Sequence, residues 1–279
     1  MSGWYNKLKL KESKLNLIAG PCVLESKEHA FDMSGALIEI CDELDINFIY
    51  KTSFDKANRT SKDSYRGEYD LREADDIFSR LESEVLTDVH ESWQPALLSN
   101  VNVLQIPAFL CRQTDLIIGC AATGKPTNIK KGQFTSPESM EWVVEKHGGD
   151  VLLTERGTFF GYNNLVVDML SLVKMKEYAP VIFDVTHSVQ QVSGRVTSGN
   201  REFAPVLGRA ATAIGIDGLF MEVHNDPDNA PSDGENMIRL KDFRGIVETI
   251  LEFATVAQKV EHLTCNEDVP GSIPGGGSI

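Results

Sequence analysis

Short apolar runs recur along most of the chain, and each is nearly continuous in hydrophobicity rather than alternating. Strands that are covered on both faces, as in parallel sheets, have this pattern, whereas a strand with one face in water alternates apolar and polar positions. We therefore predict eight strands, at Leu15–Ala19, Asn47–Lys51, Val85–Val89, Val101–Ile106, Thr127–Lys130, Val151–Thr154, Val181–Val185 and Gly218–Glu222.

Amphipathic helical patterns separate several of these strands. An apolar stripe that includes Met33 and Leu37 follows Ser26, a residue type that caps helix N-termini. Ser136-Pro137-Glu138 combines a capping hydroxyl, a proline and an acid, which favours the start of another helix, and Gly148 is placed to end it. Strands and helices therefore alternate along most of the chain.

The number and spacing of these elements predict a (β/α)8 barrel, a single α/β domain in which parallel strands close into a cylinder. Eight strands over roughly 250 residues match that fold in count and size. The alternative is an open doubly wound sheet. No Gly-x-Gly-x-x-Gly motif follows the first strand and no change in composition marks a second domain, so we favour the barrel.

The two ends and one internal segment differ from this pattern. We expect a polar N-terminal segment at residues 1–14, the barrel at 15–261 and a disordered tail at 262–279, because the tail cannot bury a core. Residues 188–200 are polar, contain two glycines and follow the seventh strand. We predict that they form a mobile loop after that strand.

The composition limits the partners and the location. The chain of 279 residues has 27 Lys and Arg against 41 Asp and Glu, so its net charge is 27 − 41 = −14. Such a charge argues against nucleic acid or an anionic membrane as a partner, because both bind basic surfaces. The start lacks the apolar region of a signal peptide, no apolar run has the length of a membrane span, and the five cysteines do not form a disulfide pattern. We therefore predict a cytoplasmic protein.

The predicted strand ends carry many basic residues. In a barrel the carboxyl ends of the strands meet at one mouth, where active sites lie. Like charges repel, so gathering them there lowers stability unless an anion is bound. Six basic residues fall at or near these ends: Lys51, Lys56, Arg59, Arg112, Lys130 and Arg156. We infer a substrate with one or more phosphate or carboxylate groups.

Four further residues near the strand ends could bind a metal. Cys22 follows the first strand, His187 the seventh, and Glu222 ends the eighth, while Asp233 lies in the loop after it. Strands 1, 7 and 8 are neighbours in a closed barrel, and thiolate, imidazole and carboxylate ligands together suit zinc, iron or manganese. From the residues alone, Cys22 could equally be a small buried residue and Asp233 a turn residue. A nucleophilic pair of Cys22 and His187 would leave the basic residues unexplained.

Several strand-end motifs resemble those of one enzyme family. The match spans roughly Leu15 to Ala257, and the motifs follow one another in the same order. They are Ile18–Cys22, Lys51–Ser61, Gln105–Asp115, Asn128–Phe134, Arg156–Asp168, Phe183–Gln190, Phe220–His224 and Ser232–Gly234. This set resembles 3-deoxy-D-manno-octulosonate 8-phosphate synthase, also called 2-dehydro-3-deoxyphosphooctonate aldolase.

The resemblance implies a fold, a reaction and an assembly. The fold is a (β/α)8 barrel, and the reaction condenses phosphoenolpyruvate with D-arabinose 5-phosphate and water to give the eight-carbon sugar acid phosphate and inorganic phosphate. That product feeds the inner core of bacterial lipopolysaccharide, and the family suggests a homotetramer. The metal-independent form has asparagine where this chain has Cys22, so the resemblance implies the metal-dependent form, with a divalent metal held by Cys22, His187, Glu222 and Asp233.

The resemblance also implies roles for individual residues. Lys130 and Arg156 would hold the phosphate of phosphoenolpyruvate, and Asn58, Arg59 and Thr60 would contact arabinose 5-phosphate. The full expected set for substrate binding is Asn58, Arg59, Thr60, Gln105, Arg112, Lys130 and Arg156. The expected catalytic set is Lys51, Lys56, Asp88, His187 and Asp233, with the proton-transfer groups left open. Two segments that would cover the substrate, Glu68–Asp70 and Ser198–Asn200, depart from the family's glycine-rich sequences.

Two other functions remain open. The related 3-deoxy-arabino-heptulosonate 7-phosphate synthase uses erythrose 4-phosphate, but its usual Lys-Pro-Arg-Thr motif is replaced here by a sequence that contains Asn58. A barrel that binds a sugar phosphate without turnover is the second alternative, and it would not need the four metal-ligand candidates.

Overall fold

Eight parallel strands close into a barrel in the computed structural model, which describes residues 7, 8, 10, 14–59, 61–159, 165–193 and 196–265 without the side chains of 192–198 and 255–265. Each strand pairs with the next, and the last pairs with the first. The strands are β1 (Asn16–Gly20), β2 (Asn47–Lys51), β3 (Glu84–Asp88), β4 (Val103–Ile106), β5 (Thr127–Lys130), β6 (Val151–Glu155), β9 (Val181–Asp184) and β12 (Gly218–His224). All eight lie within two residues of their predicted bounds, so the predicted barrel is confirmed.

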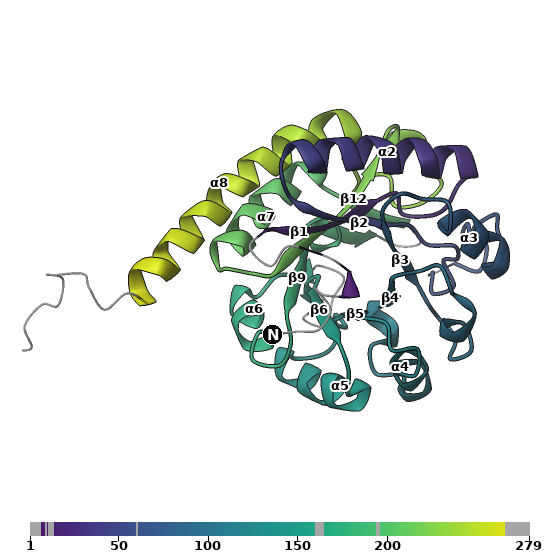
Figure 1. Cartoon of the computed structure of the whole chain (residues 1–279), viewed down its shortest axis with the longest axis horizontal. Helices are drawn as coiled ribbons and strands as arrows, with labels where there is room; N and C mark the ends of the chain where they lie inside the picture. Colours follow the sequence, from purple (N-terminus) through teal and green to yellow (C-terminus); the bar gives the residue numbers. More distant parts are fainter. Residues whose placement is uncertain are drawn as a thin grey trace, which may run out of the picture.

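Helices surround the barrel, as Figure 1 shows. They are α2 (Lys27–Glu43), α3 (Leu71–Phe78), α4 (Thr114–Ala121), α5 (Met140–His147), α6 (Met169–Met175), α7 (Ala204–Ala213) and α8 (Leu240–Cys265). A short 3-10 turn, Pro95–Leu97, takes the place of a helix between β3 and β4. The right-handed βα order places every strand's carboxyl end at the same mouth.

Local sequence sets several helix ends. The Ser26 hydroxyl accepts a hydrogen bond of 3.0 Å from the backbone N–H of His29, which confirms the predicted cap of α2. Asp70, in one of the two segments that depart from the family, caps α3 by accepting two backbone N–H groups of its first turn. Gly148 ends α5 in the left-handed conformation, with φ of +66°, as glycine does most easily.

Side chains alternate between the inside and the outside of the barrel along each strand. The outward residues, such as Leu17, Tyr50 and Phe183, pack with the helices in the main core. The inward residues below the mouth form a separate apolar cluster of Ile18, Ile49, Leu86, Val103, Leu152, Ile182 and Phe220. Both faces of every strand are therefore buried, and this explains why the strands read as continuous apolar runs.

The N-terminal segment contributes to the interior of the barrel, contrary to its expected place outside the barrel. Leu8 is buried and belongs to the inner cluster, and the half-buried Leu10 packs against it. The reason is geometric, because the inward residues at the lower end of a closed barrel would otherwise face water. The polar composition of residues 1–14 concealed these two apolar positions.

The segment predicted as a loop at residues 188–200 contains a β-hairpin. Strands β10 (Gln190–Ser193) and β11 (Val196–Gly199) pair antiparallel, directly after the 3-10 turn His187–Val189. Their β-branched residues favour extended backbone, which outweighed the loop signal of the two glycines. Two smaller additions are the pair β7 (Thr158–Phe159) and β8 (Leu165–Val166), and β13 (Ile238–Arg239), which extends the sheet beside β12.

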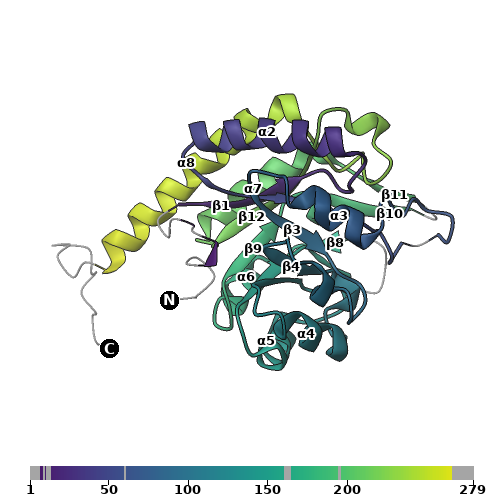
Figure 2. The same ribbon diagram turned by 45° about the vertical axis from the view of Figure 1, so that its right-hand side comes forward.

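The last helix is longer than the sequence indicated. Helix α8 continues to Cys265, past the expected barrel end at 261, and Figure 2 shows its yellow end extending beyond the barrel. The rest of the predicted tail lies outside the described residues. In the part of the chain that the structure describes, no helix is long and apolar enough to cross a membrane.

The burial of Leu8 yields a stability prediction. We expect Leu8→Ala to lower the free energy of unfolding by about 2–4 kcal/mol, because it removes a buried side chain from the lower end of the barrel. Leu170→Ala is the control, since Leu170 is 65% exposed on α6. Urea unfolding followed by circular dichroism measures both; equal, small losses would contradict a structural role for the N-terminal segment.

Candidate active site

A cavity of about 480 Å³ opens at the carboxyl ends of the strands. Most of its polar lining comes from residues that the sequence singled out: Lys51, Lys56, Asn58, Arg59, Asp88, Gln105, Lys130, Arg156, His187, Glu222 and Asp233. Ser64, Tyr65, Phe109, Gln133, Phe159, Gln190 and Ser232 also line it, without having been assigned a role from sequence. The predicted gathering of basic side chains at one mouth is thus present.

One predicted substrate-binding residue, Arg112, is not part of this cavity, and the structure does not test another, Thr60. Arg112 is exposed and is absent from the lining, although it follows the strand end that carries Gln105. Thr60 lies outside the described residues. The convergence of basic groups therefore comprises Lys51, Lys56 and Lys130 with two arginines, Arg59 and Arg156.

Acidic side chains accompany the buried lysines. The Lys51 ammonium lies 3.2 Å from Glu222 and the Lys130 ammonium lies 2.6 Å from Asp184, while Lys56 lies 3.8 Å from Asp88. These are inward positions at or near the strand ends, so alternation along the strands brings them together. Asp184 is the partner that sequence reasoning missed, although it ends β9 within a motif already noted.

Burial and neighbouring charges shift the pKa values of Lys51 and Lys130 in opposite directions. Burial disfavours the charged form of Lys51, but Glu222 and Asp88 outweigh it and raise the Lys51 pKa above its ordinary value. For Lys130, burial together with the nearby Lys51 outweighs Asp184 and lowers the pKa. An incoming anion beside Lys130 would favour its charged form.

Arg156 also has unused hydrogen-bonding capacity. Its Nη2 donates a 2.7 Å hydrogen bond to Gln190 at the start of the hairpin, whereas its buried Nη1 has no partner among the described residues. A buried N–H group normally has an acceptor. Burial lowers the Arg156 pKa, but a guanidinium remains charged at neutral pH. Arg156 and Lys130 line the same cavity and together suit a phosphate group.

A directed chain of hydrogen bonds crosses five strand ends and converges on Asp88. Thr154 donates to the Asn128 side-chain oxygen (2.6 Å), Asn128 donates to Gln105 (2.8 Å), and Gln105 donates to Asp88. From the other side, the Ser53 hydroxyl donates to Asp88 at 2.7 Å and itself accepts from Lys56 at 3.0 Å. Both Asp88 oxygens thus accept hydrogen bonds.

Asp88 is a carboxylate in this network. Burial would raise its pKa, but Lys51 and Lys56 overcome that effect and hold the pKa well below its ordinary value. A group that accepts hydrogen bonds on both oxygens and resists protonation is suited to hold Lys56 in place rather than to exchange protons itself.

Three of the four predicted metal ligands are close together. The ligand atoms of Cys22, Glu222 and Asp233 lie within 4.8 Å of one another, and one buried oxygen of Glu222, Oε2, has no hydrogen-bond partner in the described part of the chain. His187 lies beside this group, with Nε2 at 3.6 Å from that oxygen and Nδ1 at 2.8 Å from Asp184. The donor set and the unpartnered oxygen fit a divalent cation.

Arg59 contacts the same group. Its guanidinium donates to both oxygens of Asp233 at 2.9 and 2.7 Å and lies 3.4 Å from the Cys22 sulfur. Burial, with Glu222 next in effect, raises the pKa of the Cys22 thiol to about 11. A cation bound there would therefore displace the proton of the Cys22 thiol. It would either share Asp233 with Arg59 or take the place of Arg59 as the partner of Asp233.

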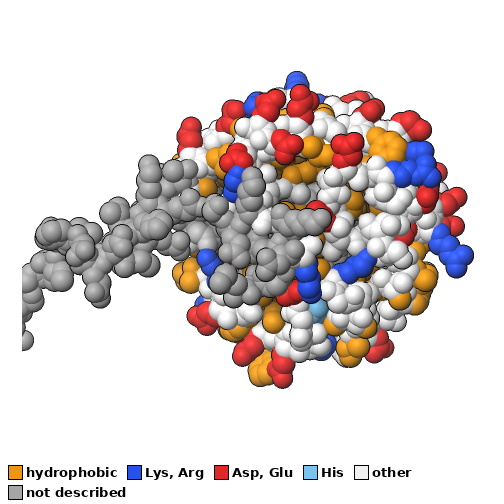
Figure 3. Space-filling view, in the orientation of Figure 1, with side chains coloured by type: hydrophobic (Ala, Val, Ile, Leu, Met, Phe, Trp, Pro, Cys, Tyr) orange, Lys and Arg blue, Asp and Glu red, His pale blue; other side chains and the backbone are white. Residues whose placement is uncertain are grey.

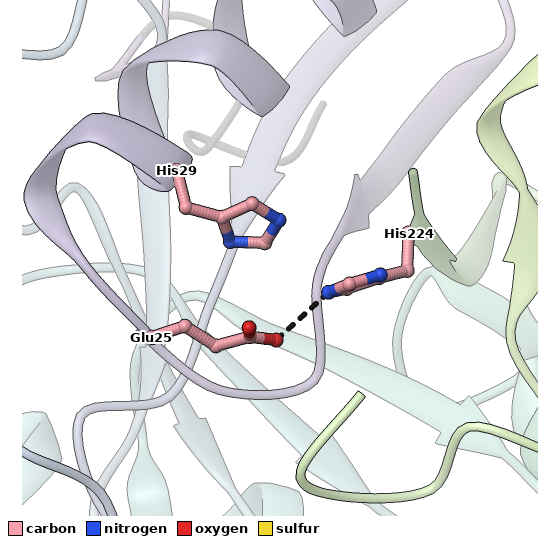
Figure 4. A group of neighbouring side chains, drawn as sticks. All are labelled: Glu25, His29 and His224. Atoms are coloured by element: carbon pink, nitrogen blue, oxygen red, sulfur yellow. Dashed lines mark hydrogen bonds and ion pairs between the residues drawn. The ribbon is translucent and has the colours of Figure 1, made fainter. Parts of the chain in front are cut away.

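A second group of metal-ligand side chains lies outside the cavity lining. Glu25, His29 and His224 have ligand atoms within 4.8 Å of one another (Figure 4). His224 Nδ1 accepts the backbone N–H of Asp226 at 2.9 Å, so its proton is on Nε2, which lies 2.8 Å from Glu25. The nitrogen that faces the group is thus a donor, and the group connects the segment after β1 to the end of β12 rather than forming a metal site.

The outer surface has the opposite sign to the cavity. On the face that Figure 3 shows, acidic side chains are spread around the outline of the molecule, whereas basic ones are fewer. The net charge of −14 therefore describes the exterior and is compatible with an anion site inside the barrel.

Comparisons with known proteins agree on one family. The profile of the DAHP synthetase I family matches residues 7–259 of the chain. A protein named 2-dehydro-3-deoxyphosphooctonate aldolase from Bartonella tribocorum is 51% identical over 261 residues, which cover 89% of this chain and 94% of the relative. Proteins of the same name from Rhodopseudomonas palustris and Bradyrhizobium diazoefficiens are 54% and 52% identical, each over 88% of this chain and 90% or 91% of the relative.

The charge on Asp88 predicts a pH-dependent contribution to stability. Its folded-state pKa is lower than the unfolded value of about 3.9, so its stabilisation is complete above that value and is lost as the pH falls toward the folded-state pKa. We expect Asp88→Asn to lower the free energy of unfolding by about 3 kcal/mol at pH 6, because it leaves Lys56 without its buried partner.

The difference between the wild type and Asp88→Asn should shrink between pH 6 and about pH 3.5, since only the wild type has this carboxylate to protonate. Urea unfolding at both pH values measures it. Asp76→Asn is the control, because Asp76 forms an exposed ion pair with Arg80. A difference that stays constant over this range would show that Asp88 is not a stabilising buried carboxylate.

Proposed function

The chain belongs to the DAHP synthetase I family and, within it, to the 2-dehydro-3-deoxyphosphooctonate aldolases, and from this premise we propose the reaction that it catalyses. It condenses phosphoenolpyruvate with D-arabinose 5-phosphate and water to give 3-deoxy-D-manno-octulosonate 8-phosphate and inorganic phosphate. The observation that carries the proposal is the cavity in which five lysine and arginine side chains converge at the mouth of an otherwise acidic barrel. Two phosphorylated substrates require such a site.

The reaction needs a positive environment and controlled access of water. Carbon 3 of phosphoenolpyruvate attacks the aldehyde carbon of the sugar, water adds at carbon 2, and inorganic phosphate leaves. Negative charge is present on the phosphate and carboxylate and develops on the aldehyde oxygen as the new carbon–carbon bond forms. Fixed cations in a cavity that excludes bulk water stabilise such charges more than solvent does.

The contacts support a division of roles among the cations. Lys130 and Arg156 hold the phosphate of phosphoenolpyruvate. Lys130 has a lowered pKa, and one N–H-bearing nitrogen of Arg156 has no partner among the described residues. Lys51 and Lys56 lie beside them to neutralise the remaining charge, and Asp88 orients Lys56 through Ser53. Asn58 and Arg59, which also line the cavity, bind arabinose 5-phosphate, and Thr60 is expected to contribute as well.

The hairpin after β9 restricts water in this proposal. Gln190 begins the hairpin, lines the cavity and accepts a hydrogen bond from Arg156. A phosphate bound to Arg156 would therefore influence the hairpin through the hydrogen bond between Arg156 and Gln190. Closure over the bound substrates would admit water only at carbon 2.

A divalent metal is part of the proposal. Cys22, His187, Glu222 and Asp233 would hold zinc, iron or manganese, and the unpartnered Glu222 oxygen supports this set. When bound there, the cation would supply Lewis-acid polarisation of the sugar aldehyde and its neighbouring hydroxyl, or would orient the water. The protein residues themselves keep the ligand atoms together, with Lys51 neutralising Glu222.

We also propose a cytoplasmic homotetramer that supplies an eight-carbon sugar acid for lipopolysaccharide synthesis. The exposed rings of Phe109 and Phe134 lie 6.4 Å apart, and Phe109 lines the cavity. Exposed aromatic side chains of this kind are common where subunits meet, which supports an assembly around the cavity mouth.

The reaction is tested by measuring phosphate release from purified protein with phosphoenolpyruvate and either arabinose 5-phosphate or erythrose 4-phosphate. We expect turnover with arabinose 5-phosphate and at least a hundredfold lower kcat/KM with erythrose 4-phosphate, on the order of 3 kcal/mol of discrimination. Preferential use of erythrose 4-phosphate would favour the heptulosonate 7-phosphate synthase. Binding of both substrates without phosphate release would favour a non-catalytic barrel.

The metal is tested by exhaustive chelation. We expect activity to be lost on chelation and restored by divalent zinc, iron or manganese, and metal content to fall in Cys22→Ser. Cys41→Ala is the matched control, because Cys41 is also a buried free cysteine but lies on α2 in the main core. Full activity of metal-free enzyme would refute the role of Cys22.

A further inference from the structure

A fully buried ion pair lies behind the phosphate-binding cations, outside the barrel interior. Lys131 and Glu155 are 0% and 1% exposed in their side chains, and the Lys131 ammonium lies 3.5 Å from Glu155 Oε1. Neither side chain lines the cavity. Each directly neighbours, in sequence, one of the two cations proposed to hold the phosphate, since Lys131 follows Lys130 and Glu155 precedes Arg156.

The pair results from strand register. Lys130 is opposite Thr154 in the β5–β6 ladder, and the Lys131 backbone N–H donates to Thr154 at 2.8 Å. Because successive side chains point to opposite faces, Lys130 faces the cavity while Lys131 and Glu155 face the helices. The two cations that face the cavity and the buried pair that faces the helices therefore lie on opposite faces of the same two strand ends.

Glu155 holds the backbone that carries Arg156. Its Oε1 accepts the N–H groups of Arg156 and Gly157 at 3.0 and 2.7 Å, and its Oε2 accepts the hydroxyl of Ser171 in α6 at 2.7 Å. Gly157 has φ of +94°, a conformation that other residues rarely adopt. The carboxylate thus stabilises the sharp turn by which Arg156 enters the cavity.

Lys131 holds the segment after Lys130. Its ammonium donates to the Thr158 hydroxyl at 2.8 Å and to the backbone oxygens of Gly132 and Thr135 at 3.3 and 3.4 Å. The same segment contains Gln133, which lines the cavity and whose backbone oxygen accepts the N–H of Phe159 at 2.8 Å. One ammonium group therefore connects the loops after β5 and β6.

Stability alone is a poor reason for such a pair. Burying two charges is costly, and packed apolar residues of similar size often stabilise a protein as well or better. What an apolar pair could not supply is the set of hydrogen bonds to the two loop backbones. We propose that Lys131 and Glu155 are positioning residues that fix Lys130 and Arg156 at the spacing required by the phosphate of phosphoenolpyruvate.

This inference rests on the proposed function, in which Lys130 and Arg156 bind that phosphate, and it predicts an effect on one substrate only. We expect Lys131→Met to raise the Kd for phosphoenolpyruvate, measured by calorimetry, by about tenfold or more, because small displacements of binding groups have large effects. The KM for phosphoenolpyruvate should rise in parallel, whereas the KM for arabinose 5-phosphate should change by less than about twofold. Lys131→Arg should recover part of the affinity, since it keeps the charge and the donors.

A milder variant tests the same role with a smaller risk of misfolding. Ser171→Ala removes one hydrogen bond to Glu155 and no charge, and we expect it to raise the Kd for phosphoenolpyruvate by about threefold while the protein stays folded. Lys174→Met is the matched control, because Lys174 pairs with Glu138 on the surface, where both side chains are about half exposed. That variant should leave both KM values unchanged.

The outcomes separate this inference from the proposed function. An unchanged Kd for phosphoenolpyruvate in folded Lys131→Met and Ser171→Ala would overturn the positioning role and leave the proposed function intact. Equal increases in both KM values would also overturn it, since they would indicate a general structural effect. A wild-type protein that neither binds phosphoenolpyruvate nor releases phosphate would overturn the proposed function, and the positioning role with it.

Discussion

The arrangement of this protein depends on balancing charges that a closed barrel buries together. Parallel strands point their last inward side chains into one space, and here several of those side chains are lysines and carboxylates. The buried ammonium of Lys51 remains charged because Glu222 is 3.2 Å away, and Lys130 has Asp184 at 2.6 Å. Without these partners, burial would drive the lysines toward their neutral form, and a neutral amine binds phosphate poorly.

The neutralisation of the buried cations is incomplete, and this favours the binding of an anion. Lys130 retains a lowered pKa despite Asp184, and a buried nitrogen of Arg156 has no partner among the described residues. At Asp88, by contrast, both oxygens accept hydrogen bonds, one from Ser53 and one from Gln105. Lys130 and Arg156, which are proposed to share one phosphate, are thus the two cations whose charge or donors an anion would complement. The Glu222 oxygen without a partner among the described residues lies instead with the candidate metal ligands.

Two layers behind the cavity maintain these positions. Below it, the apolar cluster that includes Leu8 occupies the interior of the barrel. Outside it, the buried pair of Lys131 and Glu155 holds the turns from which Lys130 and Arg156 emerge. Arg59 and the candidate metal ligands share Asp233, so the proposed sugar-phosphate and metal sites would meet at a single carboxylate.

The sequence by itself determined the fold and most of the cavity lining. Continuous apolar runs required strands buried on both faces, their spacing allowed helices between them, and the strand ends carried Lys51, Lys130 and Glu222 in positions that a barrel brings together. What could not be predicted depends on contacts between distant segments. The pairing of Lys130 with Asp184, the burial of Leu8 and the exposure of Arg112 each depend on which neighbour a side chain meets, and the residue's own type does not specify that.

The same limit applies to local structure at the mouth. Two glycines indicated a loop at residues 188–200, yet extended pairing produced a hairpin, because backbone hydrogen bonds between its two arms outweigh a weak local preference. Lys130 and Lys131 are identical in type and adjacent in sequence, and only the tertiary structure shows that they have different surroundings. Strand alternation turns one side chain into the cavity and the other toward Glu155, and that difference in environment decides what each can do.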